Sequence, residues 1–122
     1  MTNKKLFPET YDGVRLLVER LRAPDGCPWD REQTPDTLKH LLMEECYELL
    51  EAIDEDDRNK LVDELGDVLF HLAFQVHLGV EEGTVAADQV FTAVIEKLTR
   101  RHPHVFGEAE ASDARQVESS WH

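Results

Sequence analysis

The chain has 122 residues, 41% of them hydrophobic, and carries a formal net charge of −13. This length suits one domain with a single core, and the acidity argues against a general nucleic-acid binder, which would carry a basic face. Bound cations and local basic side chains still permit a nucleotide ligand. Two isolated cysteines, Cys27 and Cys46, and no recognisable signal peptide predict a cytoplasmic protein. No apolar run approaches membrane-spanning length.

Helical periodicity dominates the chain and predicts four main helices. The first covers about Tyr11–Leu21, and turn residues predict a loop over 22–34. Thr34-Pro35 is a helix start, because the hydroxyl caps the helix and proline suits its first position. The remaining predicted helices cover 34–53, 58–80 and 87–101. Short connections predict an all-α antiparallel bundle over residues 1–107, and the polar segment 108–122 predicts a loosely held tail.

Two carboxylate pairs stand out in this helical sequence: Glu45-x-x-Glu48 and Glu64-x-x-Asp67. Residues three apart share one face of a helix, so each pair offers two carboxylates in one direction. A hairpin of the second and third helices would set the two pairs opposite each other. Because hard divalent cations prefer carboxylate oxygens, the sequence predicts a Mg²⁺ or Mn²⁺ site and metal-assisted chemistry on phosphates.

The surroundings of both pairs are apolar, which an ordinary solvated face would not be. Glu45 falls near the middle of an apolar face, where an unpaired carboxylate is strongly disfavoured. The third helix has a main apolar stripe, with a polar stripe beside it and aromatic residues beyond. The apolar stripe is Leu61, Leu65, Val68, Leu69, Leu72 and Val76; the polar stripe is Lys60, Glu64, Asp67, His71 and Gln75. Phe70 and Phe74, beyond the polar stripe, suggest an oligomer interface.

Simpler interpretations stay open for several of these residues. An isolated ExxE pair is often a solvated face, Lys60 can pair with Glu64 four residues on, and His71 can be a hydrogen-bonded core histidine. Lys97 and Arg101 share a face and suit a polyphosphate. Cations also gather at the carboxyl end of a helix because the helix dipole favours them there.

Four segments occur in an order that is typical of one known family. They are Gly26-Cys27-Pro28-Trp29-Asp30 with Gln33-Thr34, the stretch 44–53, the stretch 63–70, and the stretch 97–107. The pattern EExxE, a spacer and ExxD is met by Glu44, Glu45, Glu48, Glu64 and Asp67. With these segments the chain resembles the MazG-type nucleoside triphosphate pyrophosphohydrolases over nearly its whole length.

The resemblance implies a helical fold that is active at least as a dimer, in a homodimer or homotetramer. It also implies Mg²⁺-dependent hydrolysis of nucleoside triphosphates to monophosphates and pyrophosphate, as in the clearing of nucleotide pools, with no nucleic-acid polymer or membrane as partner. Carried over by position, Glu45, Glu48, Glu64 and Asp67 would bind metal, and Glu44 would support the catalytic water. Lys60, Lys97 and Arg101 would contact phosphate. Trp29 would either contact the base or fill the interior of the bundle.

Departures from the family pattern leave base and sugar preference open. Pro35 follows Gln33-Thr34 where the family commonly has histidine, and His40-Leu41 replaces a frequent Pro-Tyr pair. The tail around Trp121 is expected to be a truncated remnant of a longer segment. Two other functions compete: a ferritin-like di-iron oxidase, which normally needs Glu-x-x-His motifs that His71 and His77 do not complete, and a non-catalytic helical nucleotide-binding or regulatory module.

Overall fold

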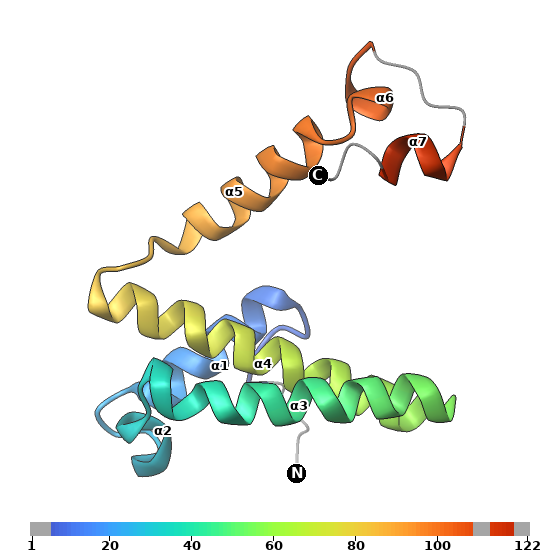
Figure 1. Ribbon diagram of the computed structural model, residues 1–122. Helices are drawn as coiled ribbons and strands as arrows, with labels where there is room; N and C mark the ends of the chain where they lie inside the picture. Colours follow the sequence, from blue (N-terminus) through green and yellow to red (C-terminus); the bar gives the residue numbers. More distant parts are fainter. Residues whose placement is uncertain (1–5, 109–112, 119–122) are drawn as a thin grey trace. The chain divides into compact units, whose positions relative to one another are not determined.

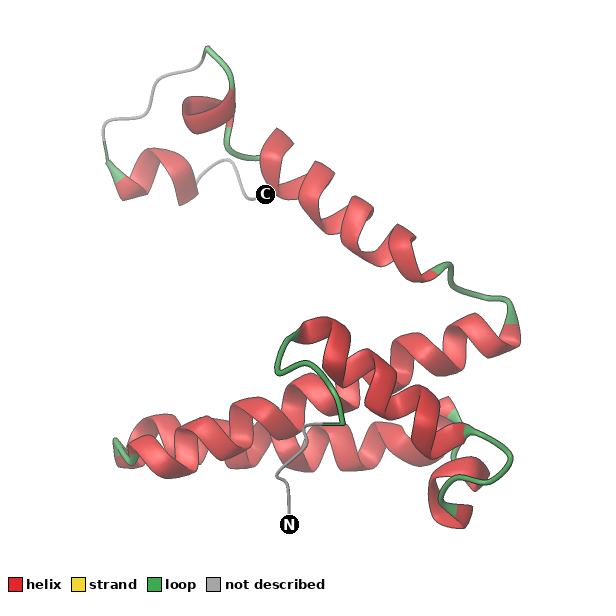
Figure 2. Ribbon diagram, turned by 180° about the vertical axis from the view of Figure 1, so that it is seen from behind, coloured by secondary structure: helices red, strands yellow, loops and turns green. Residues whose placement is uncertain are grey.

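The computed structural model describes residues 6–108 and 113–118, and within these ranges every regular element is a helix (Figures 1 and 2). The all-α prediction is therefore confirmed. The chain divides into two compact units, residues 1–84 and 85–122. Each unit has its own internal packing, and the prediction of one domain over 1–107 stays a prediction. None of the described helices is long and apolar enough to cross a membrane.

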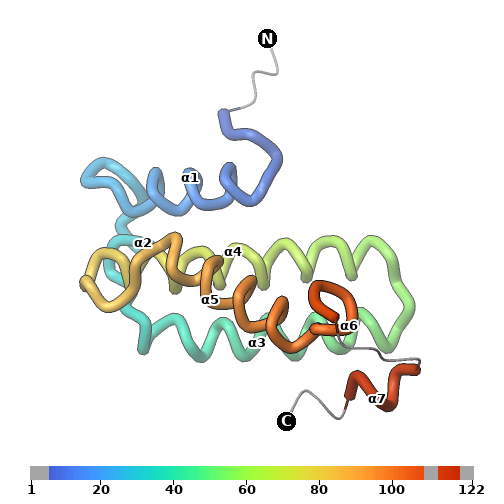
Figure 3. Tube along the Cα trace, turned by 90° about the horizontal axis from the view of Figure 1, so that it is seen from above, coloured from blue at the N-terminus to red at the C-terminus, as the bar shows by residue number. Residues whose placement is uncertain are grey.

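The first unit consists of α1 (Tyr11–Arg22), α2 (Pro28–Glu32), α3 (Pro35–Glu55) and α4 (Arg58–Glu82). Helices α3 and α4 lie side by side as a hairpin, and α1 packs on α4 (Figure 3). Thr34 caps α3 as predicted: its hydroxyl accepts from the amide of Thr37, while the Thr37 hydroxyl accepts from the amide of Thr34. Helix α4 ends at Gly83, whose left-handed φ of 75° suits glycine.

The core of the first unit lies where α1, α3 and α4 meet. It consists of Val18, Leu38, Phe74 and Leu78. In the stripe described above as the main apolar one of α4, Leu65, Leu69 and Leu72 are exposed, whereas Phe74 and Leu78, beyond the polar stripe, are buried. Phe74 is fully buried in the chain's own core, so the suggestion that it forms an oligomer interface is wrong. Helix α4 has two apolar stripes, and α1 and α3 cover the one that contains Phe74.

The segment predicted as a loop contains the short helix α2, which a single arginine fastens to the unit. The Nη1 atom of Arg22 donates to the carbonyl oxygens of Asp30, Arg31 and Gln33 at 2.8, 2.8 and 3.0 Å. Its Nε and Nη2 atoms donate to the carboxylate of Glu81 on α4. The side chain of Arg22 is only 12% exposed. A guanidinium with five rigid donors can thus satisfy the carbonyl end of α2 and join it to two longer helices.

The second unit contains α5 (Ala87–Arg100), α6 (Pro103–Phe106) and α7 (Ala114–Glu118). Helix α5 ends before Pro103, as predicted, and Pro103 occupies the first turn of α6. The apolar face of α5 and the residues of α6 line a hollow of about 470 Å³. Helix α7 lies within the predicted tail, while Trp121 lies outside the described residues.

Candidate metal centre

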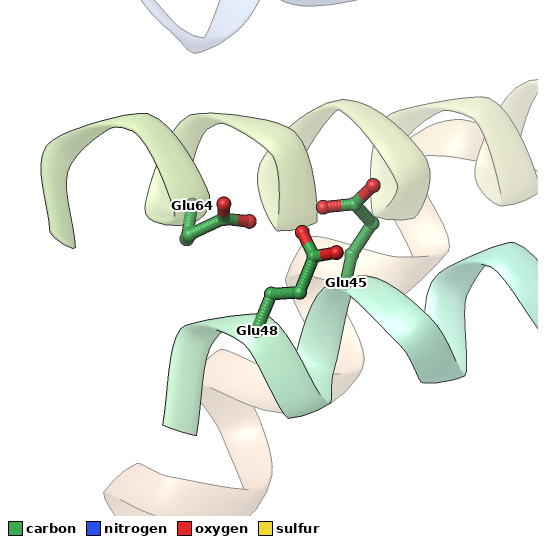
Figure 4. A group of neighbouring side chains, drawn as sticks. All are labelled: Glu45, Glu48 and Glu64. Atoms are coloured by element: carbon green, nitrogen blue, oxygen red, sulfur yellow. The ribbon is translucent and has the colours of Figure 1, made fainter. Parts of the chain in front are cut away.

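Helices α3 and α4 carry all the carboxylates of the predicted site. A hydrogen bond from Nε2 of Gln75 to the carbonyl oxygen of Pro35 (3.1 Å) joins the open end of the hairpin. Glu45 and Glu48 on α3 extend toward Glu64 on α4, and Figure 4 shows the three carboxyl groups gathered between the two helices. The structure therefore brings these three residues together in the arrangement that the predicted hairpin requires.

The carboxylates form two overlapping groups that share Glu64. One oxygen from each of Glu45, Glu48 and Glu64 lies within 4.8 Å of the others, and the same holds for Asp63, Glu64 and Asp67. Asp63 was not predicted. Neighbouring residues diverge by roughly 100° around a helix, so a face that contains Glu64 and Asp67 does not include it; the only signal was its place beside Glu64.

Burial sets the protonation of the two inner glutamates. Glu64 is 7% exposed, and burial raises its pKa to about 7, with the neighbouring carboxyls of Glu45 and Glu48 adding to the rise. Burial is also the main cause that raises the pKa of Glu45, to which the charges of Asp67 and Glu48 contribute. Carboxyls that repel one another in a desolvated place favour the protonated form unless a cation balances them.

A divalent cation fits this donor set. Among the described residues, the Oε2 atoms of Glu45 and Glu64 are buried and have no hydrogen-bond partner. Buried polar atoms are rarely left unpaired, because their desolvation is then uncompensated. Oxygen-only ligands from two helices suit a hard ion such as Mg²⁺, Ca²⁺ or Mn²⁺. The carboxylates of Glu45, Glu48, Glu64 and Asp67 could together hold one or more such ions.

Glu44 and Lys60 flank this centre. Glu44 is exposed on α3, so its role toward the catalytic water stays a prediction. The ammonium group of Lys60 donates to the carboxylate of Glu55 at 3.0 Å and lies 3.9 Å from that of Glu51. Lys60 therefore pairs with the end of α3 and not with Glu64, the partner that its position four residues earlier suggested. The side chain of Lys60 stays half-buried, one turn before Glu64 on the same helix.

His71 continues the polar stripe of α4 one turn beyond Asp67. Its Nδ1 atom is buried and has no hydrogen-bond partner in the part of the chain that the structure describes. The interpretation of His71 as a hydrogen-bonded core histidine is therefore wrong at this nitrogen. Burial lowers the pKa of the imidazole, against the opposing effect of the Asp67 charge.

The other predicted site residues lie further along the chain. Trp29 on α2 is 51% exposed, so it does not fill the core of the first unit, and a contact with a base stays a prediction. Lys97 lies on α5, and Arg101 caps the end of that helix. Both belong to the second unit, and their approach to the carboxylates stays a prediction as well.

Comparison with known proteins agrees with this geometry. Residues 33–106 match the model of the MazG nucleotide pyrophosphohydrolase domain. The chain is 47% identical over 108 residues to the nucleoside triphosphate pyrophosphohydrolase/pyrophosphatase MazG of Thermotoga maritima, covering 88% of this chain and 42% of that protein. It is 41% identical over 111 residues to the nucleoside triphosphate pyrophosphohydrolase of Escherichia coli K12, covering 90% of this chain and 42% of the relative.

A third relative is the uncharacterised protein YabN of Bacillus subtilis, 43% identical over 118 residues, which are 97% of this chain and 24% of that protein. The chain thus spans between about a quarter and about two fifths of the length of these three relatives. The match nevertheless includes the whole α3–α4 hairpin and each carboxylate of the centre. Because of this match and this group of carboxylates, the chain belongs to the MazG nucleotide pyrophosphohydrolase domain family.

Proposed function

We propose that this protein hydrolyses nucleoside or deoxynucleoside triphosphates to the monophosphate and pyrophosphate with the help of a divalent cation, Mg²⁺ or in its place Mn²⁺. The observation that carries the proposal is the convergence of Glu45, Glu48 and Glu64, with two buried unpaired oxygens, between helices of a MazG domain. The names of the Thermotoga and Escherichia relatives support the same reaction. Clearing of nucleotide pools is the corresponding biological role.

Each residue of the centre has a part in this proposal. Glu45, Glu48, Glu64 and Asp67 hold the cation, which when bound supplies positive charge to the phosphate oxygens and lowers the pKa of water. Glu44 orients the attacking water from its exposed place beside Glu45.

Attack on the α-phosphorus breaks its bond to the oxygen bridging to the β-phosphate. Lys60, Lys97 and Arg101 balance the charge of the departing pyrophosphate. Trp29 offers an exposed indole face to the base.

The oligomeric state and the cellular location of the protein are part of the same proposal. Large apolar side chains are exposed on both helices of the hairpin, and apolar surface of this extent is typical of a region that another protein covers. They include Met43, Tyr47 and Leu50 on α3 and Leu65, Leu69 and Leu72 on α4. We infer a homodimer or homotetramer in which a second copy covers this face. Cys27 and Cys46 are both free thiols, which supports a reducing, cytoplasmic setting.

The test is a pyrophosphate-release assay over a panel of triphosphates, in Mg²⁺ and in EDTA. Metal-dependent release of pyrophosphate with the matching monophosphate supports the proposal and reveals base preference. Glu45→Gln and Asp67→Asn are expected to lose turnover at least a hundredfold with unchanged helical circular dichroism, while Asp54→Asn on exposed α3 surface keeps it.

Two outcomes would contradict the proposal. Release of orthophosphate would place the cleaved bond elsewhere. A folded, metal-binding protein that turns over no triphosphate would instead favour a non-catalytic nucleotide-binding or regulatory module.

A further inference from the structure

Three buried polar atoms without a hydrogen-bond partner are found among the described residues: Oε2 of Glu45, Oε2 of Glu64 and Nδ1 of His71. The two carboxylate oxygens belong to the metal centre. His71 lies on the same face of α4, seven residues after Glu64, so its nitrogen extends this unsatisfied region along the helix. A buried donor or acceptor without a partner is unfavourable, and one that lies beside a functional site is a candidate for a hydrogen bond to a ligand.

The register of the hairpin shows why α3 supplies no partner to this nitrogen. Gln75, four residues after His71, contacts Pro35 on α3, while Glu64 lies against Glu45. His71 therefore faces the part of α3 between Pro35 and Glu45. The side chains that are buried or half-buried in that part are Leu38, Leu41 and Leu42, and its polar residues are exposed. Leucine side chains can cover an imidazole, but they have no group that can form a hydrogen bond with it.

The two ends of the metal centre differ in the side chain that they offer, an ammonium group that can exchange Glu55 for a phosphate at one end and an imidazole at the other, and this difference gives a bound substrate a direction. Lys60 stands one turn before Glu64, and His71 stands one turn after Asp67, each about 6 Å along the helix axis from the centre. Distal phosphates carry the most charge and suit the ammonium group. A nucleoside has weakly polar edges and apolar ring faces, which suit a neutral imidazole beside leucines.

We propose that the nucleoside moiety of the substrate lies at the His71 side of the centre, with its distal phosphates toward Lys60, and that Nδ1 of His71 hydrogen-bonds to the nucleoside. This inference rests on the proposed function and adds to it the orientation of the substrate and a residue that contacts the nucleoside. Neutral histidine can donate or accept at Nδ1, so either kind of polar atom on the sugar or base would satisfy it.

The experiment compares two ligands that share the phosphates and differ in the nucleoside. Binding of an α,β-methylene nucleoside triphosphate and of inorganic tripolyphosphate is measured by calorimetry in Mg²⁺ for the wild type and for His71→Leu. Because His71→Leu loses one hydrogen bond, its affinity for the nucleotide is expected to be about tenfold lower than that of the wild type. Its affinity for tripolyphosphate should be unchanged. His71→Asn, which keeps a hydrogen-bonding group near the position of Nδ1, should recover most of the affinity.

His77→Gln is the matched control, because His77 lies on the same helix but pairs with Glu81 at 2.7 Å and not with the carboxylates of the metal centre. It should change neither affinity. Equal weakening of both ligands by His71→Leu would show that His71 supports the metal centre as a whole, and an unchanged nucleotide affinity would show that no nucleoside contacts it; either result overturns the inference. Failure of the wild type to release pyrophosphate would count against the proposed function alone, because the binding contrast does not depend on turnover.

Discussion

Replacing Glu64 by glutamine is expected to weaken the dependence of the protein's stability on both pH and divalent cations. Burial and neighbouring carboxyls raise the pKa of Glu64 from 4.5 to about 7. A carboxyl with a higher pKa in the folded state binds its proton more tightly there, so the contribution of Glu64 to the free energy of unfolding is largest below pH 4.5 and is lost as pH rises through 7. Glutamine keeps the size of the side chain and removes its charge. In EDTA at pH 8, Glu64→Gln should therefore unfold at a higher temperature than the wild type.

A bound cation is expected to reverse this order. An ion present at ten times its dissociation constant adds about 1.4 kcal/mol to the free energy of unfolding. For a chain of 122 residues, that corresponds to a rise of about 5–6 °C in the unfolding temperature. The wild type should show this rise in Mg²⁺ at pH 8 and a smaller one at pH 5.5, where protons compete for Glu64. The variant, which lacks the shared carboxylate of both acidic groups, should show almost none.

The measurement is thermal unfolding followed by circular dichroism, in EDTA and in Mg²⁺, at pH 5.5 and pH 8. Glu82→Gln is the control, because Glu82 is exposed at the end of the same helix and its loss changes the net charge equally. Two results would refute the reasoning: a Mg²⁺-induced rise in Glu64→Gln as large as that of the wild type, or the same pH dependence in both proteins without metal.

Four further substitutions test other parts of the structure. Phe74→Ala should lower the free energy of unfolding by about 3–5 kcal/mol in urea denaturation; a loss below 1 kcal/mol would contradict the assigned core. Thr34→Ala, which removes the cap of α3, should lower it by about 1 kcal/mol while the Mg²⁺-induced rise persists. Arg22→Ala should shift the fluorescence emission of Trp29, as α2 loses its fastening, and unchanged emission would argue against that role. Lys60→Gln should raise KM for triphosphates, which a steady-state assay will show; an unchanged KM would remove Lys60 from the phosphate site.

The local chemistry of the chain was enough to predict where the long helices begin and, to within two residues, where they end. Thr34 and Pro35 provide both a cap and a favourable first residue, and Gly83 provides the left-handed end, so these boundaries depend on neighbours in sequence. The approach of Glu45 to Glu64 followed from the same logic, because two adjacent helices with a short turn have few other ways to pack. Carboxylates within apolar stripes were the signal that located the candidate site.

Features that depend on distant partners were not predictable in the same way. Helix α4 is apolar on two sides, and periodicity alone does not tell which side the rest of the unit covers; Phe74 is buried, while Leu69 in the main apolar stripe is exposed. Helix α2 has five residues, too few for a periodic signal, and depends on the guanidinium of Arg22 from another helix. Lys60 had a suitable partner at Glu64 within its own helix, but in the folded hairpin Glu55 is nearer.

The pairing of Lys60 with Glu55 has a thermodynamic consequence for ligand binding. Because the ammonium group already holds a carboxylate, any phosphate that it receives enters by exchange, and one ion pair is given up as another forms. The affinity gained at Lys60 is then the difference between two charge interactions, and it is smaller than a lysine facing only water would provide. The released carboxylate of Glu55 would return to solvent, so the hairpin could accept a highly charged ligand and let its product leave again.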